Sequence, residues 1–182
     1  MALTIAQIVN LYETRGAAQY GSEAVSQMEH ALQCAALAER AQAAPDLIAA
    51  CLLHDLGHLL ADAPHENGRD VDDVHQYLAI PFLQGVLPPA VLEPVRLHVE
   101  AKRYLCCVEP GYWHDLSGAS KHSRELQGGA WTPQEAERFS ARPHAREAVA
   151  LRRWDDLAKV PGKATPGLAR YAVLLAGLTA TV

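Results

Sequence analysis

Apolar residues recur at intervals of three and four along the chain, and alternation with a period of two is nearly absent. Ile5, Ile8, Val9 and Tyr12 form one such stripe, which puts their side chains on one face of a helix. The fold is therefore predicted to be an all-α helical bundle. Helices are expected near residues 4–15, 24–43, 46–60, 71–84, 89–105, 117–126, 133–141, 143–159 and 166–178.

Local signals mark the ends of several segments. Thr132, Pro133 and Glu135 form a capping box with proline at the first helical position, and Thr165–Pro166 predicts a second start of this kind. Residues 61–70 include a proline, an asparagine and a glycine, and they are predicted to form a loop that could border a site. No internal repeat or linker is visible, so residues 1–182 are expected to form a single domain.

Composition narrows the possible partners. The chain is 49% hydrophobic with a net charge of -5 and no long basic stripe, so nucleic acid is not expected to bind. Cys34, Cys51, Cys106 and Cys107 form no CxxC pair and are expected to be buried, reduced thiols. There is neither a leader-like N-terminus nor an apolar stretch long enough for a bilayer, which favours the cytoplasm and no membrane partner.

The segment from Cys51 to His58 carries the first candidate chemistry. His54 and Asp55 are adjacent at the end of an apolar helix, and His58 follows His54 by one helical turn. An imidazole and a carboxylate in apolar surroundings need a partner, and a metal ion satisfies both. This segment is therefore a candidate metal site.

Further candidate ligands lie one per predicted helix, on the apolar side: His30, His75, His98 and, in a later helix, Asp155. Taken singly, each histidine is more often a hydrogen-bonded helix residue than a ligand. Taken together with His54–Asp55, they indicate a metal centre. The remaining histidines fall outside this pattern and are expected to be surface or structural residues: His65, His114, His122 and His144.

The order of these residues resembles the HD-domain superfamily, in which a His, a His-Asp pair and a distant Asp hold one metal. The resemblance implies that His30, His54, Asp55 and Asp155 hold this ion; Asp156 is a rival, but Asp155 directly follows a tryptophan as in the family motif. In members with two metals, Asp55 would bridge the ions, and two further histidines, His75 and His98, would bind the second. Four imidazoles among six ligands disfavour Mg and suit Fe, Mn or Zn.

A closer similarity, nearly end to end, is to the HD-domain oxygenases of phosphonate degradation. It is carried by Tyr20-Gly-Ser-Glu23, Met28-Glu-His30-Ala-Leu-Gln-Cys34, His98-Val-Glu-Ala-Lys102, Ser120-Lys-His-Ser123, Glu125-Leu-Gln127-Gly-Gly129 and Leu151-Arg-Arg-Trp154-Asp155.

This similarity implies two iron ions in the mixed-valent Fe(II)/Fe(III) state and O2 as co-substrate. It implies cleavage of the C–P bond of a 1-hydroxyphosphonate into phosphate and a carboxylic acid. The substrates implied are 2-amino-1-hydroxyethylphosphonate, which would give glycine, and its trimethylammonio analogue, which would give glycine betaine. Smaller 1-hydroxyphosphonates stay open.

The resemblance also assigns roles around the metals. Asp55, Tyr20 and Glu23 are expected to be catalytic, with Tyr20 occupying the open iron position when substrate is absent and Glu23 meeting the cationic end of the substrate. Lys102 lies one turn from His98, so its ammonium is expected to face the same cavity. The remaining expected substrate contacts are His58, Ser120, Ser123 and Gln127.

Other interpretations of the same residues remain open. Lys102 could be a solvated helix end, the serines could be caps, and Glu23 a surface residue at a helix start. A metal-dependent phosphohydrolase acting on a nucleotide or another phosphate ester would use the same metal ligands. A non-catalytic HD module that senses a ligand is a further alternative, although all six ligands are present. The oligomeric state is not indicated by the sequence.

Overall fold

The structure is a computed structural model that describes residues 2–60 and 74–179. This part of the chain is helical and contains no β-strand beyond two isolated bridges, which confirms the predicted all-α class. None of its helices combines the length and the apolar character needed to cross a bilayer. The helices are α1 (Ile5–Arg15), α2 (Gln27–Arg40), α3 (Pro45–Leu53), α4 (Leu56–Leu60), α5 (His75–Leu78), α6 (Ile80–Leu83), α7 (Pro89–Val108), α8 (Tyr112–Asp115), α9 (Gly118–Leu126), α10 (Pro133–Ser140), α11 (Ala145–Leu157) and α12 (Leu168–Thr179).

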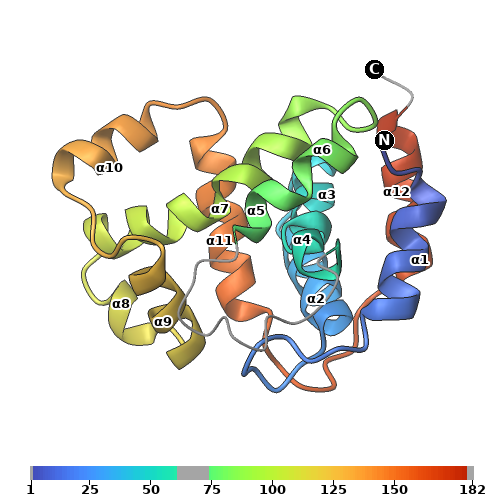
Figure 1. Ribbon diagram of the computed structural model, residues 1–182, viewed down its shortest axis with the longest axis horizontal. Coiled ribbons are helices and arrows are strands. Elements are labelled where there is room, and N and C mark those ends of the chain that lie inside the picture. Colours follow the sequence, from blue (N-terminus) through green and yellow to red (C-terminus); the bar gives the residue numbers. More distant parts are fainter. Residues whose placement is uncertain (1, 61–73, 180–182) are drawn as a thin grey trace.

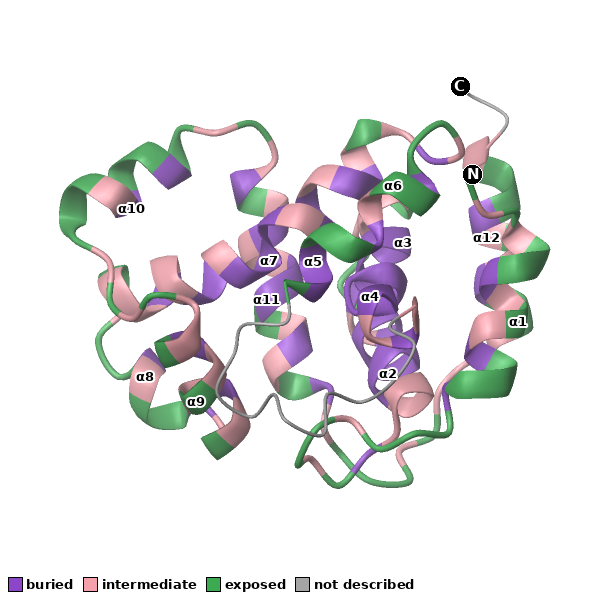
Figure 2. Cartoon of the chain, in the orientation of Figure 1, coloured by how far each residue is buried: buried purple, intermediate pink, exposed green. Residues whose placement is uncertain are grey.

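The long helix α7 runs through the middle of the molecule and packs along α11 and α3, while α2 packs against α3 and α11 (Figure 1). Helices α1 and α12 cover the α3–α4 side, and α8, α9 and α10 lie at the other end of α7. Buried residues concentrate on α2, α3, α4, α7 and α11 (Figure 2). The candidate ligands come from this buried centre and from its edge at α5.

Several helices differ from the prediction in their limits. The expected helix 46–60 is two helices, because α3 ends at Leu53 and α4 begins at Leu56. The described part of the expected helix 71–84 is also two short helices, and α5 begins after Val74, whose φ of 48° is left-handed. Helix α8 was not predicted, and α12 begins two residues after Pro166. The predicted loop at 61–70 and residues 71–73 lie outside the described residues.

The predicted cap at Thr132 is present: its side chain accepts from the Glu135 N–H, and the Glu135 side chain accepts from the Thr132 N–H. All four cysteines are free thiols, and Cys34 and Cys51 are buried as expected. Cys106 and Cys107, also expected to be buried, are only half-buried; they lie in the last turn of α7, where Cys106 packs against Leu105, Tyr112 and Leu116.

Candidate metal centre and active site

The break between α3 and α4 presents two candidate ligands side by side. His54 is the C-cap residue of α3 and Asp55 lies between the two helices, and both side chains are buried in the bundle. The other candidates come from α2, α5, α7 and α11. All six are buried, with between 0% and 8% of their surface exposed: His30, His54, Asp55, His75, His98 and Asp155.

Asp55 lies at the centre of this group. Its Oδ2 is 3.2 Å from His54 Nε2 and 3.5 Å from His30 Nε2. Its Oδ1 is 3.2 Å from His75 Nε2 and 3.6 Å from His98 Nε2. Each carboxylate oxygen therefore faces a different pair of imidazoles, which is the arrangement of a carboxylate that bridges two ions.

Backbone carbonyls fix the orientation of three imidazoles. The Nδ1 of His30 lies 2.9 Å from the Ala158 carbonyl, that of His54 lies 2.9 Å from the Cys51 carbonyl, and that of His98 lies 2.7 Å from the Val95 carbonyl. A carbonyl only accepts hydrogen bonds, so each Nδ1 carries the hydrogen. The Nε2 atoms are then left as the ligand atoms, as is usual in metal sites.

In each of the two imidazole pairs, the two Nε2 atoms point toward each other. His30 Nε2 and His54 Nε2 are 3.1 Å apart, as are His75 Nε2 and His98 Nε2. His30 and His54 both carry the hydrogen on Nδ1, so their Nε2 lone pairs would repel each other unless a proton or a metal ion lies between them. Two nitrogens bound at about 2.1 Å and at a right angle on one metal are roughly 3.0 Å apart.

Two buried carboxylate oxygens support a metal rather than protons alone. Asp55 Oδ2 and Asp155 Oδ1 have no hydrogen-bond partner among the described residues. A buried anionic oxygen without a partner is costly, and a metal ion would remove that cost. The side chains His30, His54 and Asp155 come close enough to hold one ion, and Asp55, His58 and His75 a second. The predicted ligand His98 lies in reach of the second position as well, since its Nε2 is 3.1 Å from His75 Nε2 and 3.6 Å from Asp55 Oδ1. The residues present thus fit a dinuclear metal centre.

The electrostatics of the cluster favour bound cations. Burial raises the pKa of Asp55, but His54 and His75 outweigh it and hold this pKa well below the usual range. Burial lowers the pKa of His54, but the Asp55 carboxylate outweighs it and raises this pKa to about 10. Both shifts show that the Asp55 carboxylate stabilises a positive charge placed beside it.

Arg152 separates the roles of the two neighbouring aspartates. It donates to Asp155 Oδ2 at 2.6 Å, while Asp155 Oδ1 points toward His30 Nε2 at 3.4 Å. Asp156, the rival ligand, instead pairs with Arg152 and accepts from the Tyr112 hydroxyl. Asp155 is thus the aspartate that faces the histidines.

Three cations and two hydroxyls gather beside the cluster. Lys102 is 2% exposed and its Nζ donates to Ser123 Oγ at 2.6 Å. Ser120 Oγ lies 3.3 Å from Arg152 Nη2 and 3.1 Å from Lys159 Nζ. Burial and the charge of Arg152 lower the pKa of Lys102 to about 7. Arg152 is also paired with Asp155 and Asp156, and Lys159 with Glu23, but the hydrogen-bond donors gathered here suit a small anion.

Tyr20 and His58 line the same region. The ring of Tyr20 stacks on that of His30 with a centroid distance of 3.9 Å. Burial together with the Asp55 and Asp155 carboxylates raises the pKa of Tyr20 well above its usual value, so its hydroxyl stays protonated. The His58 ring stacks on that of His75, and its Nε2 is 4.0 Å from Asp55 Oδ1.

Two other predicted residues lie differently. Glu23 is engaged by the protein itself, since its Oε1 accepts from Ser117 Oγ at 2.6 Å and from Lys159 Nζ at 3.1 Å. Gln127 is the C-cap residue of α9, and its buried Oε1 has no hydrogen-bond partner among the described residues. No contact given by the structure joins Gln127 to the histidine cluster, so its predicted substrate contact stays a prediction.

Sequence reasoning missed Arg152 and Lys159. A signal was available, because they lie three residues before and four residues after Asp155, which is the spacing of one helical face. The histidines set aside as surface or structural residues lie as expected where they are described: His114 and His122 are exposed, and His144 is half-buried. His65 lies outside the described residues.

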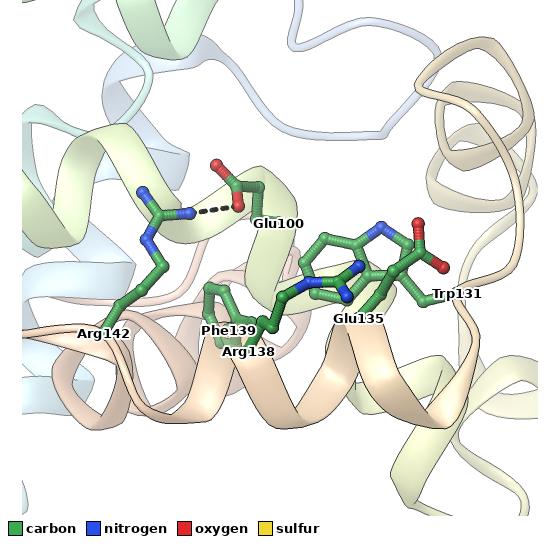
Figure 3. A pocket seen from close by; sticks show the side chains of 6 residues that line it. All are labelled: Glu100, Trp131, Glu135, Arg138, Phe139 and Arg142. Atoms are coloured by element: carbon green, nitrogen blue, oxygen red, sulfur yellow. Dashed lines mark hydrogen bonds and ion pairs between the residues drawn. The ribbon is translucent and has the colours of Figure 1, made fainter.

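A surface pocket between α7 and α10 is lined by none of the cluster residues (Figure 3). Glu100 and Arg142 pair across one side of it, so two of its charges already satisfy each other. Its lining residues are Glu100, Trp131, Glu135, Arg138, Phe139 and Arg142.

Comparison with known proteins agrees with this geometry, although no protein-family model matches the chain. The chain is 43% identical over 169 residues to hydroxymethylphosphonate dioxygenase from Gimesia maris, a match that covers 92% of this chain and 84% of that protein. It is 34% identical over 169 residues to [1-hydroxy-2-(trimethylamino)ethyl]phosphonate dioxygenase (glycine-betaine-forming) from Leisingera caerulea, with 92% and 86% covered. An uncharacterized protein of Acanthamoeba polyphaga mimivirus is 31% identical over 172 residues. The chain therefore belongs to the family of phosphonate dioxygenases.

Proposed function

We propose that the protein uses O2 to cleave the C–P bond of a 1-hydroxyphosphonate at a centre of two iron ions, releasing phosphate and a carboxylic acid. The observation that carries this proposal is the position of Asp55, whose two oxygens face two imidazole pairs near the buried side chains of Lys102, Ser120 and Arg152. The relatives named as dioxygenases of hydroxyphosphonates support the reaction class. The free thiols support a reducing compartment such as the cytoplasm.

The proposed ligands divide between two ions. His30, His54 and Asp155 would hold one, His75 and His98 the other, and Asp55 would bridge them. Four imidazoles and two carboxylates suit iron better than magnesium. A mixed-valent Fe(II)/Fe(III) pair would supply the redox chemistry that activates O2. The contribution of the chain is to keep the Nε2 atoms turned inward through the carbonyls of Cys51, Val95 and Ala158.

The anion site would hold the phosphonate. Lys102, Arg152, Ser120 and Ser123 place two cations and two hydroxyls within reach of one another, which matches the charge and the acceptor oxygens of a phosphonate. Because Arg152 also binds Asp155, the phosphonate would be fixed directly beside a metal ligand. His58 would add a donor on the other side of Asp55.

The reaction balances without a further reductant. One C–H bond and the C–P bond of the substrate break, and one C–O bond and one P–O bond form. The carbon is oxidised from an alcohol to an acid, and O2 accepts the four electrons. Tyr20, stacked on His30 over the cluster, would keep water out before substrate binds and would move aside when it does.

The test is to load the purified protein anaerobically with Fe(II), then to add air and a 1-hydroxyphosphonate while following oxygen and free phosphate together. The expected result is one O2 consumed for each phosphate released, and no turnover in Asp55→Asn. Phosphate release without oxygen uptake, or release only from a nucleotide, would show the metal-dependent phosphohydrolase instead.

A further inference from the structure

Lys159, just after the end of α11, has a side chain that is only 13% exposed. Its Nζ lies 3.1 Å from Glu23 Oε1, 3.1 Å from Ser120 Oγ and 5.9 Å from the centre of the Tyr20 ring. A carboxylate, a hydroxyl and an aromatic face are the groups that recognise an organic ammonium ion. In this protein they surround an ammonium that belongs to the chain.

Glu23 is held in this ion pair as an anion. Burial raises the pKa of Glu23, but the hydrogen bond from Ser117 and the charge of Lys159 outweigh it and lower this pKa below the usual value. The Glu23 side chain is 16% exposed, so solvent screens the pair only in part. Glu23 also lines a surface pocket together with Ala17, Gln19, Ala24, Val25 and Ser26.

A substrate with a cationic end would need this carboxylate. With Lys159 in place, two cations would face one partly buried anion, and like charges brought together at a recognition site cost affinity. Hydroxymethylphosphonate has no charge beyond its phosphonate and needs no counterion. The ion pair therefore matches a substrate without a cationic end.

We propose that Lys159 is a specificity-determining residue: it occupies the counterion position of Glu23 and so selects 1-hydroxyphosphonates without a cationic end, hydroxymethylphosphonate above all, over their 2-amino and trimethylammonio analogues. This inference rests on the proposed function. The sequence analysis expected Glu23 to bind the cationic end of the substrate. In this chain the Glu23 carboxylate is instead paired with Lys159.

The experiment compares the native chain with Lys159→Met and with the control Lys163→Met. Lys163 lies four residues further on, and its ammonium makes no ion pair within residues 2–60 and 74–179. For each protein, kcat/KM is measured with hydroxymethylphosphonate and with [1-hydroxy-2-(trimethylamino)ethyl]phosphonate. The Kd of each compound is also measured by calorimetry on the anaerobic, iron-loaded protein.

The native chain is expected to favour hydroxymethylphosphonate by about tenfold or more, in both kcat/KM and Kd. Lys159→Met is expected to reduce this ratio by about tenfold, mainly through tighter binding of the trimethylammonio compound, whereas Lys163→Met leaves it unchanged.

Two further variants support the comparison. Lys159→Gln keeps a polar side chain beside Ser120, and the same ratio is measured on it if Lys159→Met does not fold. Glu23→Gln, which leaves the Lys159 charge uncompensated, is expected to weaken the trimethylammonio compound further.

An equal loss for both compounds in Lys159→Met and Lys159→Gln would overturn the inference and assign Lys159 to phosphonate binding. A native chain that prefers the trimethylammonio compound would overturn it as well. In both cases phosphate is still released with oxygen uptake, so the proposed function stands. If no 1-hydroxyphosphonate is turned over by any variant, the proposed function itself has failed.

Discussion

Burial lowers the pKa of Lys102 to a value near neutrality. The pKa is about 7 without an anion, because burial and Arg152 disfavour the ammonium. Lysine is protonated below its pKa, so its attraction for a phosphonate is lost as the pH rises through about 7. KM is therefore expected to rise with pH between about pH 6 and pH 8.

Lys102→Arg provides the control for this effect, since a guanidinium stays charged throughout this range. The second ionisation of the phosphonate is common to both proteins, so the difference between the two KM profiles isolates the lysine. Profiles of the same shape would show that Lys102 does not bind the substrate as a cation.

Gly57 is required by the close approach of α4 to α5. A Cβ at this position would lie 2.1 Å from the His75 carbonyl oxygen and 2.8 Å from its carbonyl carbon. Gly57→Ala is expected to shift His75, to lower the free energy of unfolding by about 1–3 kcal/mol and to release one of two irons. Iron content and chemical denaturation measure both effects.

Gly177→Ala is the matched control, because a Cβ there meets nothing within 4 Å and the residue lies in α12. It is expected to stabilise the protein by up to about 1 kcal/mol and to keep both irons. A Gly57→Ala protein with full iron content would mean that His75 does not depend on this contact.

The apolar pattern of the sequence predicted the limits of some helices and missed those of others. It predicted α2, α7 and α10 within a few residues, because each has a one-sided stripe or a clear cap. It missed the break at His54–Asp55, since Leu53 and Leu56 on either side are both fully buried and the apolar spacing continues across it.

The N-terminus of α2 allows a test of an element that carries a ligand. Ser26 and Glu29 form a capping box one turn before His30. Ser26→Ala is expected to cost about 1 kcal/mol and to weaken iron binding through fraying of the first turn. Thr132→Ala removes a capping box of the same kind from α10, which carries no ligand, so it is expected to cost a similar amount of stability with iron binding unchanged. Equal iron affinity in both variants would contradict this coupling.

Over the whole molecule, the ligand candidates could be proposed from the sequence because several histidines on apolar helix faces occur together with the His54–Asp55 pair. Arg152 and Lys159 were missed although their spacing from Asp155 was visible, since a charged residue is solvent-exposed in most proteins. Their burial depends on α9 and on the segment around Glu23, far away in sequence, which supply Ser120 and the carboxylate. Only the tertiary structure brings these groups together.

Removal of the metal tests whether the centre holds the bundle together. The six candidate ligands come from α2, α5, α7, α11 and the α3–α4 break, so bound ions would link most of the core. Iron at 100 times its Kd is expected to add about 2.7 kcal/mol for each ion, seen as a higher Tm than in the chelated protein. In Asp55→Asn the Tm is expected to depend far less on the chelator. An equal Tm for the native chain with and without chelator would contradict the metal centre.

The most direct measurement of the central claim is turnover of hydroxymethylphosphonate by the iron-loaded protein under ¹⁸O-labelled O2, with mass spectrometry of both products. Oxidative cleavage predicts that the label from O2 appears in the carboxylic acid product and that no phosphate forms when O2 is withheld. Unlabelled products, with phosphate released at the same rate under nitrogen, would contradict the account and show that the centre is hydrolytic.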